Sequence, residues 1–340
     1  MRSRSTPALR DEKNEKEGGR RVLTAPAPSR TQRVARRVDP VPLIPVLALL
    51  GLVVWVIAIS PTTLSYNGFD LLLSSAIPFV FATLSEMVIV ALGDIDLGIG
   101  YFVGLTNVVA AQIMAHDAAL GGIVLVGCVL AYMAMGLLVS VRRIPSIIVT
   151  LGASFVWLGI GQLILPTPGG SVPVWLQDLF ALRSPLIPLP VVMIVVILIV
   201  TSAIIYRSPA GIALRGYGSN PLAVEAAGRN ATAIRVGAYG LAGLFGVLGG
   251  LSVTAVTASG DVTASANYTL LAVAAVILGG GEFAGGRASV LGTIAGALTL
   301  SVVGSLMGII NVSSSLQTGV EGLILIAVLA GRRLLRASLP

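Results

Sequence analysis

GYGSNPLAVEAAGRNATAIRV, residues 216–236, is a polar, glycine-rich stretch between two long apolar segments at 186–206 and 234–258. The chain as a whole is 55% hydrophobic and only 11% charged, and that charged share is less than half of the average for a soluble domain. Most of the chain therefore cannot face water, and the sequence predicts an all-α, polytopic transmembrane helix bundle. The quoted stretch is a water-facing interruption of that bundle.

Helix signals lie within this interruption. Ser219 or Asn220 is a suitable N-cap, Pro221 suits the first helical position, and Gly228 is placed to end a helix. These signals predict a short helix of about two turns over residues 221–227.

The apolar residues of this short helix, Leu222, Val224 and Ala226, have no bundle to bury them at this point of the chain. An isolated helix of fewer than about 12 to 15 residues is marginal in water, so a partner surface would explain why it forms. The alternative is an ordinary interfacial helix between two spans.

Ten apolar runs are long enough, or nearly so, to cross a hydrocarbon core of roughly 30 Å. The third begins in a charged, glycine-rich stretch and the eighth is short, so either could be a partial or broken helix. The predicted spans are 41–60, 70–91, 96–115, 118–140, 144–165, 186–206, 234–258, 267–281, 288–310 and 316–331. Together they define a transmembrane domain at 41–331.

The distribution of basic residues predicts the topology. Residues 1–38 hold 11 of the 22 Lys and Arg residues and few apolar ones, so this tail is predicted to be a disordered cytoplasmic segment that contacts anionic headgroups. Nucleic acid is not an expected partner. With ten spans, 21 of the 22 bases lie on the cytoplasmic side and only Arg183 lies outside. Cytoplasmic loops carry such an excess, so both termini and the segment at about 207–233 are predicted to be cytoplasmic.

Several chemistries are missing from the sequence. The only lysines, Lys13 and Lys16, do not lie in a Gly-x-x-x-x-Gly-Lys-[Ser/Thr] phosphate loop, so ATP energy would have to come from another chain. His116 beside Asp117 is better explained as a solvated loop residue than as part of a catalytic triad. Cys128 alone can form neither an internal disulfide nor a thiolate metal cage. No catalytic residue, metal site or bound cofactor is predicted.

Five polar residues in or beside the spans are candidates for a substrate path. A carboxylate at mid-bilayer costs roughly 2.5 to 3.5 kcal/mol, so it usually faces a bundle interior or a water-filled path. Glu86 either does so or lies near the cytoplasmic end of its helix and reaches water. Asp94 and Asp96 lie in a glycine-rich boundary that predicts a partly unwound helix entry lining a cavity. Asn107 and Gln317 are weaker candidates of the same kind.

Glycine is concentrated in two further places. In the span at 234–258 glycine recurs at every third position, and Gly246 and Gly250 form a Gly-x-x-x-Gly pair, which predicts close helix packing. The tract LGGGEFAGGRASV at 278–290 could expose backbone amides to a phosphate, but nothing else there indicates a nucleotide site.

Three tracts resemble the motifs of a known family. ALRGYGSNP at 213–221, followed by Ala226-Ala-Gly228 and Asn230, is similar to a cytoplasmic coupling segment. Ile95-Asp-Leu97 is similar to an Ile-Asp-Leu-Ser motif, and the 278–293 tract closely resembles a second-half motif. The family is the membrane-spanning permease subunits of bacterial ABC importers of the ribose/xylose/galactose type, and the resemblance covers about 90–331.

The resemblance implies an assembly in the cytoplasmic (inner) membrane. Two permease subunits would act with two cytoplasmic ATPases that bind ATP-Mg and with a periplasmic or lipid-anchored solute-binding protein. The permease domain at 41–331 would form the path for a monosaccharide or similar small polar solute, and the chain would not be an enzyme. The coupling residues that the resemblance implies are Asn220, Pro221, Leu222, Ala223, Glu225, Ala226, Ala227, Gly228 and Asn230.

Departures from the family pattern affect both the partner and the substrate. Leu222, Glu225 and Arg229 replace residues that are usually polar, basic and apolar, which points to a dedicated ATPase. Asp94 stands where Gly is common and Gly98 where Ser is usual, and related permeases carry nucleosides or branched-chain amino acids.

A second class of function remains open. A self-contained secondary transporter could be driven by ions through Glu86, Asp94 and Asp96.

Overall fold

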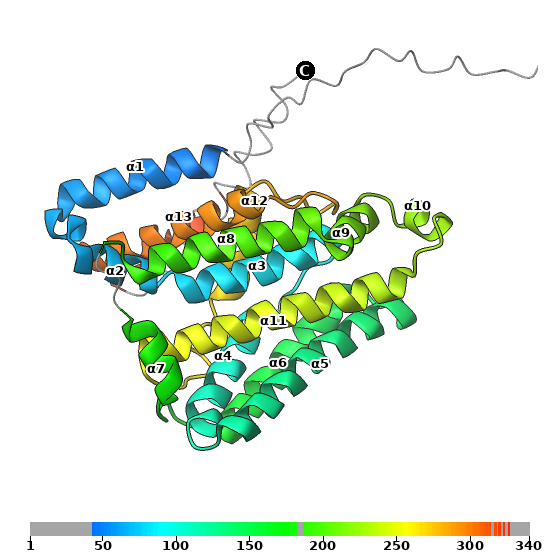
Figure 1. Cartoon of the computed structure of the whole chain (residues 1–340), viewed down its shortest axis with the longest axis horizontal. Coiled ribbons are helices and arrows are strands. Elements are labelled where there is room, and N and C mark those ends of the chain that lie inside the picture. The colour runs from blue at the N-terminus through cyan, green and yellow to red at the C-terminus, as the bar shows by residue number, and fades with distance from the viewer. Residues whose placement is uncertain are drawn as a thin grey trace, which may run out of the picture. The chain divides into compact units, whose positions relative to one another are not determined.

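The computed structural model describes residues 43–182 and 186–313, together with positions 316, 317, 319, 320, 322, 323 and 326. Within these residues every named element is a helix, so the all-α prediction is confirmed (Figure 1). The helices are α1 (Leu43–Ile59), η1 (Pro61–Leu64), α2 (Tyr66–Ser74), α3 (Ile77–Leu92), α4 (Ile99–Val108), η2 (Val109–Met114), α5 (Ala118–Arg142), α6 (Ser146–Ile164), α7 (Val174–Ala181), α8 (Leu189–Arg207), α9 (Pro209–Ser219), α10 (Pro221–Ala226), α11 (Ala231–Thr257), α12 (Tyr268–Leu278) and α13 (Val290–Ile309).

Six of these helical segments are long and apolar enough to cross a membrane, counted over the described residues. They are Tyr66–Leu92, which joins α2 to α3, and the helices α5, α6, α8, α11 and α13. The other described runs, at α1, α4 with η2, and α12, are shorter apolar helices. The predicted span at 316–331 and the predicted tail at 1–38 lie largely or wholly outside the described residues.

The two irregular spans have the partial form that the sequence allowed. Helix α12 has 11 residues, which at 1.5 Å per residue is about 16 Å, roughly half of a hydrocarbon core. Helix α4 begins only at Ile99, after a non-helical segment from Gly93 to Gly98, and continues into the π-helical turn η2. Irregular backbone of this kind is tolerated at membrane depth only where protein or a cavity surrounds it.

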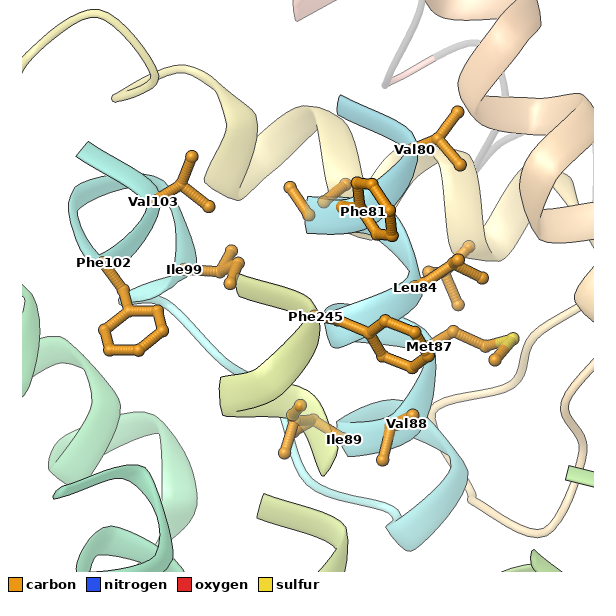
Figure 2. Packing of buried hydrophobic residues seen from close by; sticks show 14 of the residues in the cluster. Val80, Phe81, Leu84, Met87, Val88, Ile89, Ile99, Phe102, Val103 and Phe245 are labelled. Carbon is orange, nitrogen blue, oxygen red and sulfur yellow. The ribbon is translucent and has the colours of Figure 1, made fainter. Parts of the chain in front are cut away.

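Helix α3 lies at the centre of the bundle, because every one of its residues is buried. Its apolar side chains pack with those of α4 and with Phe245 of α11 (Figure 2). In the most apolar part of the Tyr66–Leu92 segment 94% of the residues are buried. In the corresponding parts of α6 and α8 only 22% of the residues are buried. Helices α6 and α8 therefore present apolar faces to lipid, which accepts them without the cost that water would impose.

Close packing of α11 explains its Gly246–Gly250 pair. This helix packs against α3, α4 and α5. A side-chain carbon on Gly246 would lie 2.6 Å from Cδ1 of Phe102, and one on Gly250 would overlap the Thr106 hydroxyl of α4. The prediction of close helix approach at the Gly246–Gly250 pair is confirmed, and small residues serve there because lipid supplies no hydrophobic drive between helices.

Candidate functional site

The polar segment between α8 and α11 folds into two helices, of which the sequence predicted one. Helix α9 was missed, although Ser208-Pro209 is a good start signal: the Ser208 hydroxyl accepts the Gly211 N–H at 3.0 Å and Pro209 occupies the first turn. Helix α10 has the predicted start, because the Asn220 side chain accepts the Ala223 N–H at 3.0 Å. Of the two predicted N-caps, Ser219 and Asn220, the structure uses Asn220.

The end of α10 also follows the sequence signals. The helix runs over Pro221–Ala226, one residue less than predicted, and Gly228 has the left-handed φ of 75° that glycine adopts at little cost. Asn230 then caps α11 by accepting the Ala233 N–H at 3.0 Å. The Asn220 side chain therefore caps the start of α10, and the Asn230 side chain caps the start of α11 after the turn at Gly228.

Helix α10 is exposed over almost its whole surface (Figure 1). Leu222 is 76% exposed and Glu225 is exposed, and only Val224 is half-buried. The other predicted coupling residues, Asn220, Pro221, Ala223, Ala226, Ala227, Gly228 and Asn230, are exposed as well. Within the described chain no packing explains an exposed leucine on a helix of six residues.

Three acidic residues lie in α3 and in the segment that joins it to α4. They are Glu86, Asp94 and Asp96, and we call them the acidic node. Asp96 is fully buried. Its Oδ1 accepts the Gly98 N–H at 2.7 Å, and its Oδ2 accepts the Tyr132 hydroxyl of α5 at 2.5 Å. Asp96 therefore anchors the entry of α4 to α5.

Asp94 is tied to α11. Its Oδ2 lies 3.2 Å from Nε of Arg235 and accepts the Tyr239 hydroxyl at 3.2 Å. The Arg235 guanidinium also lies over the ring of Tyr217 from α9, 5.4 Å from its centroid. An ion pair so little exposed needs these extra partners to offset the loss of water.

The backbone beside the two aspartates, at Ile95 and Leu97, binds α6. The Ile95 N–H donates to the Ser146 hydroxyl at 3.1 Å, and the Leu97 N–H donates to the Thr150 hydroxyl at 3.0 Å. The predicted unwound entry is confirmed as irregular backbone, and its amides are satisfied by side chains of a third helix. The segment thus joins α3 and α4 to α5, α6 and α11.

Glu86 lies in the interior of the bundle, so the alternative in which it reaches water is wrong for the described chain. Its side chain is fully buried in α3. Oε1 accepts the Asp96 N–H at 3.5 Å, and Oε2 has no hydrogen-bond partner among the described residues. A buried carboxyl oxygen without a partner is rare and costly.

The other two candidates lie apart from these contacts. Asn107 is buried in α4, where its Nδ2 donates to the Asp261 carbonyl at 3.3 Å and its Oδ1 accepts the Thr254 hydroxyl at 2.8 Å. Gln317 lies against α13, with its Nε2 3.3 Å from where a side-chain carbon on Gly304 would stand. The structure therefore brings together three of the five predicted path residues.

The loop residues His116 and Asp117 have structural contacts. Asp117 caps α5 by accepting the N–H groups of Ala119 and Leu120, both at 2.9 Å. A His116 ring nitrogen lies 2.8 Å from the Gln112 carbonyl oxygen. These contacts give the two residues a helix-end role.

The partners of the acidic node were not predictable from motifs in the sequence. Tyr132 and Tyr239 sit in apolar spans without a motif, and Arg235 counted only as a topology signal. A basic residue at the start of the predicted span at 234–258, with an acidic boundary elsewhere in the chain, was the one usable indication.

Two comparisons relate the chain to known proteins. A protein-family model described as "Branched-chain amino acid transport system / permease component" matches residues 68–329. The ribose import permease protein RbsC of Escherichia coli strain K12 is 30% identical over 301 residues, which cover 84% of this chain and 92% of that protein. The corresponding protein of Bacillus subtilis strain 168 is 30% identical over 297 residues, covering 85% of this chain and 92% of the relative.

A third relative is named only by its type. The probable ABC transporter permease protein y4mJ of Sinorhizobium fredii strain NGR234 is 31% identical over 300 residues, covering 84% of this chain and 89% of that protein. No solved structure shows a significant match.

Proposed function

The chain belongs to the family of branched-chain amino acid transport system permease components, and from that premise we propose that it forms the path through which an ATP-driven importer moves a monosaccharide. It is a multi-pass protein of the inner membrane and a permease subunit of an ABC importer, a transport component rather than an enzyme.

The exposed helix α10 carries the proposal. A partner that covers Leu222 would account for its 76% exposure in the isolated chain. Because the sequence has no phosphate loop, that partner is an ATPase which binds ATP-Mg itself. The contact surface is the run of predicted coupling residues from Asn220 to Asn230.

The proposed topology has ten spans with both termini in the cytoplasm. It is supported by the distribution of Lys and Arg and by nine described apolar helical segments at predicted span positions. It places α10 on the ATPase side. A reporter fused after residue 175 that proved cytoplasmic would contradict it.

The proposed solute is a neutral monosaccharide. Two relatives with 30% identity carry ribose in their names, while the family description names branched-chain amino acids, so an amino acid or a nucleoside is the alternative. A periplasmic or lipid-anchored binding protein delivers the solute. A second permease copy completes the path, which in this proposal passes Glu86, Asp94, Asp96, Asn107 and Gln317.

One observation favours a second function. Buried Glu86 has a carboxyl oxygen without a hydrogen-bond partner among the described residues, and such intramembrane acids occur in proton relays. In that case the acidic node would drive transport by ion movement and no ATPase would be needed.

Reconstitution distinguishes the two functions. Vesicles contain the permease, its ATPase and its binding protein, with ATP on the side of the membrane where the ATPase lies. Uptake of radiolabelled ribose is measured before and after a protonophore is added. Uptake that needs ATP and survives the protonophore supports the proposal. Uptake without ATP that the protonophore abolishes would establish the ion-driven alternative, and uptake of leucine or a nucleoside but not ribose would correct the solute.

A further inference from the structure

Three distant segments meet through backbone atoms at one point, which we call the glycine junction. They are Ala91 to Gly93 at the end of α3, Gly218 and Ser219 at the end of α9, and residues 284–286 of the loop between α12 and α13. This loop belongs to the glycine-rich tract at 278–290, for which the sequence indicated no role.

The contacts at the junction leave no room for side chains. The Gly286 N–H donates to the Ala91 carbonyl at 2.9 Å. A side-chain carbon on Gly218 would overlap both that carbonyl oxygen and the Gly286 nitrogen. One on Gly285 would lie 2.8 Å from the Gly218 carbonyl oxygen and 2.9 Å from the Gly93 nitrogen.

The backbone at the junction is specialised as well. Gly285 and Gly286 have φ values of 82° and 77°, a left-handed conformation that other residues adopt only with strain. A salt bridge of 3.0 Å between Glu282 and Arg287 spans this turn. The loop is therefore shaped to bring its backbone against α9 and α3.

Backbone contacts of this kind transmit displacement differently from side-chain contacts. A side chain can change rotamer and absorb a shift of its neighbour, whereas two backbones in direct contact must move together or separate. The residue after Gly93 is Asp94 of the acidic node, so a shift of α9 at Gly218 acts directly beside the node.

A second contact runs from α9 to the same place. Tyr217, adjacent to Gly218, lies under the guanidinium of Arg235, which pairs with Asp94. Helix α9 thus reaches the segment 91–94 both through its backbone and through an aromatic–cation contact. Helix α10, exposed to a partner, packs directly on α9.

We propose that the glycine junction carries the movement of α9 and α10 to the acidic node, with Gly218, Gly285 and Gly286 as positioning residues. The inference rests on the proposed function, because it takes the ATPase at α10 as the source of movement. It assigns the 278–290 tract to mechanical coupling rather than to phosphate binding.

The first test is Gly218→Ala in the reconstituted vesicles, with radiolabelled ribose as the probe. We expect ribose transported per ATP hydrolysed to fall at least tenfold, while ATPase binding is retained. If the substitution impaired folding alone, ribose transport and ATP hydrolysis would both fall with the amount of inserted protein and their ratio would stay unchanged. That result would overturn the proposal.

Matched controls use glycines without such contacts. A side-chain carbon on Gly216, also in α9, would lie 3.6 Å from Val224, an ordinary contact. One on Gly237 of α11 would meet no atom of the described part of the chain within 4 Å. Gly216→Ala and Gly237→Ala should keep the ratio within twofold. A tenfold loss in either control would contradict a specific role for the junction.

A cross-link tests the junction without crowding it, should Gly218→Ala fail to fold. Ser219 and Ala284 are both exposed, and Cys128 is buried, so Ser219→Cys with Ala284→Cys can be joined by a short thiol cross-linker. If the segments move as one body, transport stays within twofold. A cross-link that stops transport until reduction would show that the junction opens, and would overturn the inference.

Wild-type vesicles distinguish a failure of the junction inference from a failure of the proposed function. ATP-dependent ribose uptake by the wild type together with an unchanged ratio in Gly218→Ala rejects the junction alone. Absence of ATP-dependent uptake of any probe by the wild type rejects the proposed function, and the inference with it.

Discussion

Helix α10 and the acidic node differ in how they are held. Local capping defines α10: Asn220 and Gly228 bound it, and its side chains are exposed. Contacts with α5, α6 and α11 define the node, and its side chains are almost wholly buried. A capped, exposed element can be changed without loss of the fold and is free to meet a partner, whereas the node is part of the core.

Removal of Arg235 should have the largest effect on stability. Arg235→Ala leaves Asp94 buried without its counter-ion, which costs about 3–5 kcal/mol when one partner of a buried pair is lost. Thermal unfolding in detergent measures the change. Arg229→Ala, at an exposed position beside α10, is the control and should unfold like the wild type. Equal behaviour of the two variants would mean that the node does not stabilise the core.

Loss of the Tyr132 hydroxyl should rank second. Tyr132→Phe removes the hydroxyl that donates to Asp96, and a hydrogen bond to a charged group contributes about 1.5–3 kcal/mol. The same unfolding measurement applies, with Tyr101→Phe at a half-buried position as the control. A variant as stable as this control would show that Asp96 needs no partner from α5.

Removal of the α10 cap should act locally. Asn220→Ala costs about 1 kcal/mol of helix stability, but α10 has few contacts through which to pass that loss to the bundle. We expect faster hydrogen exchange at the Ala223 amide and an unchanged global Tm. A fall in Tm comparable to that of Tyr132→Phe would contradict the distinction between the two regions.

A charge reversal on α10 should leave stability unaltered. Glu225→Lys is a surface change worth less than about 0.5 kcal/mol, yet under the proposed function it weakens the ATPase contact and lowers transport per ATP hydrolysed. Asp178→Lys makes the same change on the exposed face of α7 and should alter neither quantity. Normal coupling in Glu225→Lys would count against α10 as the ATPase contact.

The span positions and α10 were predictable because their signals are local. Apolar runs of spanning length, an Asn-Pro start and a glycine stop are all contiguous in sequence, and the described helices follow them closely. Helix α9 was not predicted although Ser208-Pro209 marks its start, since it contains Gly211, Gly216 and Gly218 and resembles a loop.

The acidic node was only partly predictable. Asp94 and Asp96 stood out as charges at a membrane boundary, and Glu86 as a charge within a span. Their partners Tyr132 and Arg235 lie 36 and 141 residues away from Asp96 and Asp94, and no pattern along the chain pairs them. The burial of Glu86 was not predictable either, because the position of a residue along a helix does not show which neighbouring helices cover it.

Hydropathy and capping act over a few neighbouring residues, so the sequence alone predicts a helical membrane protein, most of its span positions and the short capped helix that interrupts them. The contact between the ends of α3 and α9 and the glycine-rich loop after α12, through bare backbone beside the buried acids, is visible in the folded chain alone. Such a contact depends on how separate helices pack, and glycine alone does not say which backbone approaches it.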